Sequence, residues 1–506
     1  MRVANRREFL SRVGGTLGYA AVGFALVDRA GFAETLFRRS RERLRFGALD
    51  PLVDAMQETP ADALLALLVE KLRKGTPLSD LVAAGALANA RAYGGTNYNG
   101  YHALMAMMPS YEMASQMPEP FAALPVLKVM HRNARFFQDS GRAKEDALEP
   151  LEGATGDAAL VESVRARDLP RAERSLAQLE ERSRPAAYEE LQTVVRDDMN
   201  VHRVVLAWRA YDLARLTGDQ NTVTMLRQSV RFCIDEDGRR ASQGRAPNEI
   251  VALLPRLMDE HHLDRKERGR RTADRAWIAR LSDTIFGMDR AAAAGAVAAA
   301  LGEGYEIEDV GNAMSLAATR LLLNDPGLTE AQAGKPVGSV HGASVGVHAS
   351  DSANAWRHIA RVGSPKNAFA SLIAGAYHTA GQSDHVGMVA HDHDAEACTK
   401  EDPAALLSEI DGKIRGREQK GACQAARRYC DLGHPPEKLF ALLLGFAVSE
   451  DGALHSEKYF RTAQDEHSFA LAPDRGLYLV ALTRVMASQF GYPAPGCEEA
   501  RKLLAG

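Results

Sequence analysis

The sequence predicts an all-α protein of stacked helix pairs, arranged as two related halves around a shared centre. Apolar residues recur at helical spacing along most of the 506 residues, alanine-rich runs are frequent, and aromatic residues make up only 6%. We find no set of segments with the strict apolar–polar alternation that is typical of half-buried strands. A stretch of the first half also recurs in the second half, and such internal repeats constrain the fold directly.

The repeat aligns residues 75–91 with residues 304–320 without a gap, and six of these 17 positions are identical. Shortly after each copy the chain reads Gly-x-His-Ala, with His102 in the first half and His348 in the second. We infer two homologous halves, residues 55–235 and 285–490.

Further histidines occupy matching places in the two halves. His131 and His378 each lie in an apolar helical pattern about 30 residues downstream of the Gly-x-His-Ala segments. A weaker match relates Asp-Asp-Met-Asn-Val-His202 to Glu-Asp-Gly-Ala-Leu-His455. The order of these matches along the chain supports the proposed duplication.

The N-terminus predicts an export signal at residues 1–33. Residues 5–10 read Asn-Arg-Arg-Glu-Phe-Leu, a weakly hydrophobic run covers residues 14–27, and small residues follow at 31–33. This pattern is typical of the twin-arginine (Tat) route, which carries folded proteins. We therefore expect the Tat machinery as a partner and a periplasmic or other extracytoplasmic location.

Composition argues against two classes of partner. The formal net charge is −4, so no excess of basic residues indicates nucleic-acid binding. No run of about 18 apolar residues predicts a membrane span once the signal is removed. The five cysteines include no CxxC pair, which argues against a zinc ribbon or a covalently attached haem, and we expect buried thiols.

Helical spacing and start signals predict the individual elements in chain order. A glycine- and asparagine-rich turn should deliver His102, and a loop of small residues from residue 338 should carry His341 and His348 into a helix. The charged residues 236–284 are interpreted as a linker and residues 491–506 as a C-terminal tail. The predicted helices cover residues 61–73, 81–91, 158–181, 186–196, 201–216 and 219–232, with an alanine-rich helix from residue 291.

Four histidines in duplicated settings indicate a metal centre. Imidazole is a common ligand for transition metals and binds them in its neutral form. Two histidines from each half would bring four imidazoles to one pseudo-symmetric point: His102, His202, His348 and His455. Iron, zinc or another divalent transition metal suits such ligands. A core or helix-capping role is the simpler interpretation for any one of these histidines.

Other residues are candidates for the surroundings of this centre. We expect His131 and His378 to orient the ligands or to be core residues, with His341 close by. Tyr98, Tyr101 and Trp356 are near the ligands in sequence and could line a pocket. Lys458 follows His455 by one helical turn, and from the residues alone it reads as an ordinary surface lysine.

Three segments resemble motifs of the questin oxidase-like family. They are Asn-Gly-Tyr-His102-Ala-Leu-Met-Ala-Met, Val-His348-Ala-Ser-Asp-Ser-Ala-Asn-Ala-Trp-Arg-His and His455-Ser-Glu-Lys458. The resemblance implies an all-helical non-haem iron oxygenase whose centre has four histidines and a carboxylated lysine. It thus implies His102, His202, His348 and His455 as ligands, with a carbamate formed from CO2 on Lys458.

The sequence therefore predicts an exported non-haem iron oxidoreductase of the oxygenase type. Its partners would be dioxygen and a small organic substrate. The resemblance implies that this substrate is aromatic. A metal-free helical-repeat scaffold is one alternative. A metal-dependent hydrolase is another, and it would need a carboxylate base such as Glu457 or Asp451.

Overall fold

Helices make up the regular structure of the part of the chain that the computed structural model describes. That part is residues 43–92, 97–139, 144–153, 158–287, 289–332, 337–340, 344–383 and 394–506. The proposed export signal and His341 lie outside these ranges. The described residues contain no strand beyond isolated bridges, so the all-α prediction is confirmed.

The chain divides into two units. One comprises residues 1–45 and 145–147, in which the described residues form one isolated bridge between Arg43 and Asp146. The other comprises residues 46–144 and 148–506 and holds all the helices named below. Within the described residues, no helix has the length and apolar character that a membrane span requires.

The first half is built mostly as predicted, with α3 matching its expected bounds and the region 158–216 divided into shorter helices. Its helices are α2 (Asp50–Glu58), α3 (Ala61–Arg73), α4 (Leu78–Ala92), α5 (Tyr98–Ala114), α6 (Leu124–Asp139), α7 (Ala159–Arg165), α8 (Leu169–Arg182), α9 (Arg184–Val195), α10 (Val201–Asp212), α11 (Ala214–Thr217) and α12 (Thr222–Ser242).

The charged region 236–284 is itself largely helical, and the C-terminal tail ends in a helix that packs against α3 and α6. The helices from this region onward are α13 (Ile250–Glu260), α14 (Arg275–Phe286), α15 (Arg290–Gly302), α16 (Ile307–Asn324), α17 (Val345–Val362), α18 (Pro365–Ala380), α19 (Pro403–Arg415), α20 (Gln419–Asp431), α21 (Pro436–Ser449), α22 (His455–Phe469), α23 (Arg475–Gln489) and α24 (Cys497–Ala505).

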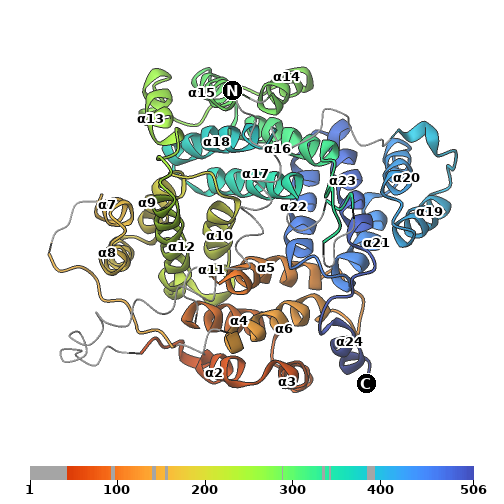
Figure 1. Cartoon of the computed structure of the whole chain (residues 1–506), viewed down its shortest axis with the longest axis horizontal. Coiled ribbons are helices and arrows are strands. Elements are labelled where there is room, and N and C mark those ends of the chain that lie inside the picture. The colour runs from red at the N-terminus through yellow and green to blue at the C-terminus, as the bar shows by residue number, and fades with distance from the viewer. Residues whose placement is uncertain are drawn as a thin grey trace. The chain divides into compact units, whose positions relative to one another are not determined.

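Four helices from distant parts of the chain form a closed ring at the middle of this unit. α5 packs against α10, α10 against α17, α17 against α22, and α22 against α5. In Figure 1, α17 lies above α5, and α10 and α22 lie on the two sides between them. Consecutive helices pack outside the ring, with α4 and α6 next to α5 and with α16 and α18 next to α17. The duplication itself stays a prediction.

Small residues and a buried arginine hold the ring in place. Gly346 brings α17 against the backbone of Leu322 in α16. The fully buried guanidinium of Arg357 pairs with Glu466 of α22 at 2.7 Å and with Glu308 of α16 at 3.0 Å. A buried arginine is stabilising only when its charge and its N–H groups are matched, and here two carboxylates from neighbouring helices supply the match.

Replacing Gly346 with alanine should destabilise the protein. The added Cβ would overlap the Leu322 backbone, which cannot move as a side-chain end can, and such overpacking costs about 1–3 kcal/mol. The matched control is Gly295→Ala in α15, where a Cβ meets no atom within 4 Å. Alanine should there stabilise the helix by about 0.5–1 kcal/mol. Urea unfolding of both variants measures the change in the free energy of unfolding, which should have opposite signs in the two. Equal changes would contradict the close α16–α17 contact.

Candidate metal centre

Each helix of the ring presents one histidine from its N-terminal part. His102 is the fifth residue of α5, His202 the second of α10, His348 the fourth of α17 and His455 the first of α22. The histidines therefore come to one place because the four helices begin there. The structure brings together the four histidines that the sequence singled out, while their role as ligands stays a prediction. His102 and His348 lie on helices rather than on the predicted turn and loop.

The four imidazole rings form a small quadrilateral. Adjacent ring centroids are 4.9 Å apart for His102 and His202, 5.4 Å for His202 and His348, 5.3 Å for His348 and His455, and 4.8 Å for His455 and His102. The order of the rings follows the order of the helices around the ring.

The ligand atoms are close enough to share one ion. The Nε2 atoms of His348 and His455 are 3.3 Å apart, and ligand atoms of His102, His202 and His455 lie within 4.8 Å of one another. Nitrogens that bind one metal at about 2.1 Å are separated by about 3 to 4.2 Å. A metal ion therefore fits among His102, His202 and His455, with the ring nitrogen of His348 next to that of His455.

Backbone carbonyls hold two of the rings in the orientation that metal binding needs. His102 Nδ1 donates to the carbonyl of Tyr98 at 2.8 Å, and His455 Nδ1 donates to the carbonyl of Gly452 at 3.1 Å. A proton fixed on Nδ1 leaves the lone pair on Nε2. Nε2 of His102 and Nε2 of His202 are buried and have no hydrogen-bond partner. These two nitrogens are therefore available to bind a ligand.

Burial keeps the imidazoles neutral. It lowers the pKa of His102, His202 and His455 well below the ordinary value, and the charges of Lys458 and of the neighbouring rings lower it further. Because a protonated imidazole cannot bind a metal, this depression favours the ligand form at neutral pH.

The turn before α22 is strained in a way that places His455. Ala453 and Leu454 both adopt left-handed backbone angles, with φ of 52° and 63°. Neither residue is a glycine, so each costs roughly 1 kcal/mol or more. Asp451 stabilises the turn by accepting a hydrogen bond from the Ala453 amide at 2.8 Å. The strain and its compensation both lie next to a candidate ligand.

Lys458 lies inside the protein, one turn after His455. Its side chain is only 3% exposed, which rules out the surface role that the residues alone suggested. Burial lowers the pKa of the amine to about 8, against the opposite effects of Asp351 and Glu457. Thr462 donates to Asp351 at 2.8 Å and so fixes this carboxylate beside the amine. Asp351 is a residue that sequence reasoning missed.

A narrow crevice leads away from Lys458 between α10, α17 and α22. It encloses about 170 Å³ of space between atoms, and none of it is wide enough for a water molecule. The side chains that line it are Val205, Trp208, Arg209, Asp351, Asn354, Ala355, Lys458 and Thr462. The crevice thus isolates the amine from solvent and does not form a substrate pocket.

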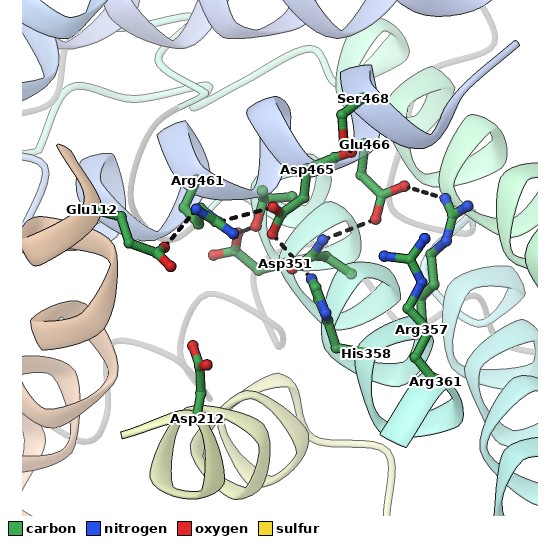
Figure 2. Close-up of polar contacts among 12 residues, drawn as sticks. Glu112, Asp212, Asp351, Arg357, His358, Arg361, Arg461, Asp465, Glu466 and Ser468 are labelled. Carbon is green, nitrogen blue, oxygen red and sulfur yellow. Dashed lines mark hydrogen bonds and ion pairs between the residues drawn. The ribbon is translucent and has the colours of Figure 1, made fainter. Parts of the chain in front are cut away.

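Charged side chains beyond the crevice pair with one another, as Figure 2 shows. Arg461 bridges Glu112 of α5 and Asp465 of its own helix, and Asp465 accepts from His358 Nε2 at 3.0 Å. The His358 ring stacks on Trp208 at 4.6 Å. This network connects α5, α10, α17 and α22 on one side of the histidines and supports their alignment.

The aromatic and outer histidine candidates divide into two groups. The rings of Tyr98 and Tyr101 lie 4.0 and 4.6 Å from the ring of His102, while the pocket that they were expected to line stays a prediction. Trp356 lies in the core, where it is 1% exposed and packs against Gly375 of α18. Its indole donates to His378 Nδ1 at 3.2 Å.

The second pair of matching histidines belongs to the core. Burial lowers the pKa of His378 to about 4, and the partner of this residue is Trp356 rather than a ligand histidine. His131 faces Gly496, just before α24. Of the two roles expected for these residues, the core role is therefore the one observed. His341 lies outside the described residues.

The carboxylates considered for a hydrolase have other partners. Glu457 is fully buried and pairs with Lys128 at 2.8 Å. Lys128 also donates to the carbonyls of Ala447 and Glu450 near the end of α21. This buried pair fixes the first turn of α22, which carries His455. Asp451 caps the preceding turn, as described above.

Comparison of the chain with models of protein families, with curated proteins and with solved structures gives no match. The family whose motifs it resembles therefore stays a prediction, and the geometry of the four histidines carries the functional argument.

The metal-free protein should lose stability as the pH falls below about 6.5. The unfolded chain then protonates its histidines, whereas folded His102, His202 and His455 stay neutral because their pKa is depressed. Each such residue adds up to about 1.4 kcal/mol per pH unit to the slope. Urea unfolding with a chelator at pH 7.5, 6.5 and 5.5 measures this, and His102→Gln should make the slope less steep. An unchanged slope in that variant would contradict a neutral buried His102.

Proposed function

We propose that this protein is a metal-dependent oxidoreductase of the oxygenase type, with a non-haem iron bound by His102, His202, His348 and His455. The observation that carries the proposal is the meeting of four imidazoles from four helices, two of them with buried Nε2 atoms that lack any partner. Core histidines that served only for packing would not be expected to gather their ring nitrogens at one point, as these do.

The choice of iron rests on the ligand set and on the motifs. Imidazole suits iron, zinc, copper and nickel alike, so the four rings alone leave zinc and other divalent ions as alternatives. The resemblance to the questin oxidase-like family favours iron. It also favours an organic, aromatic substrate that reacts with dioxygen.

Lys458 is the proposed fifth ligand, as a carbamate. An uncharged amine adds to CO2 to form R–NH–COO⁻ and releases one proton, so the reaction requires a lysine that is often neutral. Burial favours the neutral form of Lys458, whose pKa falls to about 8. The carbamate oxygens would add negative charge to a site whose other ligands are neutral.

The protein part of the mechanism is positioning and desolvation. The carbonyls of Tyr98 and Gly452 fix the tautomers of His102 and His455, and the ring of helices excludes water from the inner side of the centre. When bound, the metal supplies Lewis-acid or redox activation of oxygen or of a substrate oxygen atom.

The contacts of the two acidic residues disfavour the hydrolase alternative. Glu457 pairs with Lys128 and Asp451 stabilises a turn, so each carboxylate already has a structural partner that competes with a role as general base. The scaffold alternative requires that the protein be stably folded without metal.

The first test is the metal content of protein produced with its ligands intact. We expect about one iron per chain by elemental analysis, and loss of at least about nine-tenths of it in His348→Ala, because one of four converging ligands is removed. The surface variant His434→Ala, whose imidazole bonds only to the Glu401 carbonyl, is the control and should keep its iron. If the wild-type protein contained no metal and were still stably folded, the result would support the metal-free scaffold instead.

The second test concerns Lys458. Lys458→Arg keeps the positive charge but cannot form a carbamate, so we expect it to lose most of its metal. Lys366→Arg, at an exposed lysine paired with Asp264, is the matched control. Full metal occupancy in Lys458→Arg would refute the carbamate while leaving the histidine site in place.

A further inference from the structure

The electrostatic potential at the four histidines is positive. The N-terminal parts of α5, α10, α17 and α22 meet there, and each helix start carries a partial positive charge of roughly half a unit. Arg239 adds a further positive charge that acts on His202. Helix starts favour an anion nearby, and the unpartnered lone pairs of His102 and His202 are available to a metal.

The four histidines differ in their exposure within the described residues. His102 and His455 are 1% and 3% exposed, whereas His202 and His348 are half-buried. Tyr98, whose ring lies beside that of His102, is 47% exposed and is among the few exposed large hydrophobic side chains described. Lys458 and the crevice beside it are closed to water. Tyr98, His202 and His348 are thus the members of this cluster that are at least partly exposed.

A cation lies near the N-terminus of α10, the helix that carries the half-buried His202. Arg239 of α12 pairs with Glu236, and Glu236 accepts a hydrogen bond at 3.0 Å from Asn200, the capping residue of the helix that carries His202. Phe232, two turns earlier on the same face of α12, lies 5.4 Å from the ring of Tyr101. The Arg239 side chain is 43% exposed, so its guanidinium is accessible to a ligand.

We propose that the centre takes a substrate that binds as an organic anion, with its charged oxygen directed to the histidines and recognised from the side by Arg239. This proposal rests on the metal-dependent function proposed above and specifies its substrate class: a carboxylate or an enolate with an apolar body.

The reasons for an anion are electrostatic and geometric. A divalent metal with four neutral imidazoles and one carbamate would keep a net positive charge, and the helix starts add positive potential, so an anionic ligand gains from both. The apolar body would rest against the exposed Tyr98 ring. Glu236 competes with the ligand for Arg239, so we expect substitutions of Glu236 and of Arg239 to change the affinity for the anion in opposite directions.

The experiment is a ligand titration of the full-length protein loaded with cobalt(II), whose visible absorption changes when a ligand joins the metal. Benzoate is the anionic probe and benzamide its neutral isostere. We expect benzoate to shift the spectrum and to bind at least about tenfold more tightly than benzamide, as a direct interaction of its charge with the metal implies.

The variants assign the role of Arg239. Arg239→Gln should weaken benzoate binding about three- to fivefold, as expected for a partly exposed charge pair, and Glu236→Gln should strengthen it. Arg245→Gln, which removes an exposed charge just beyond α12, is the matched control and should change nothing. Arg239→Lys keeps the charge and should retain most of the affinity. That result would show that the loss in Arg239→Gln comes from the missing charge and not from a folding defect.

The possible results separate the two proposals. A protein that binds no cobalt would overturn the metal centre and this inference together. A protein that binds cobalt but prefers benzoate no more than benzamide would overturn the inference alone. Equal weakening in Arg239→Gln and Arg245→Gln would show a long-range charge effect and would overturn the assignment to Arg239.

Discussion

Four helix starts directed at one interior point are the constraint on which the rest of the structure depends. Each start brings one imidazole, and the rings lie about 5 Å from their neighbours only because α5, α10, α17 and α22 close into a ring. Protonation of several rings so close together would be strongly unfavourable, so burial and mutual repulsion keep them neutral. The helical layers outside the ring hold this arrangement, with Arg357 joining three of the helices.

The centre lowers the stability of the fold in several ways. Buried nitrogens of His102 and His202 lack partners, Lys458 is desolvated, and two residues before His455 have left-handed angles. Such features persist where the surrounding structure enforces them, and they concentrate at functional sites. The apolar, alanine-rich core around α4, α15 and α18 offsets these costs.

The sequence predicted the helices and the convergence of the histidines better than it predicted their surroundings. The repeated Gly-x-His-Ala setting marked His102 and His348, because a duplicated context is rarely accidental. The same pattern could not show that Lys458 is buried, since helical spacing gives the face of a helix but not what covers it.

The partners that surround the site come from distant parts of the chain. Asp351 lies in the segment that resembles a family motif, and its hydrogen bond with Thr462 joins two residues that are 111 positions apart in the sequence. The pairing of Glu457 with Lys128 depends on α6 and α22 in the same way. Long-range partners of this kind leave no local signal.

The ligands span the chain from His102 to His455, which has a consequence for how the protein matures. A nascent chain cannot assemble the centre until α22 has been synthesised and has docked against α5 and α17, so metal capture is a late event. The bound ion would then connect segments that are distant in sequence, much as a cross-link does, and would slow the opening of the ring. Metal retention is thus a measure of whether the whole helical body has closed.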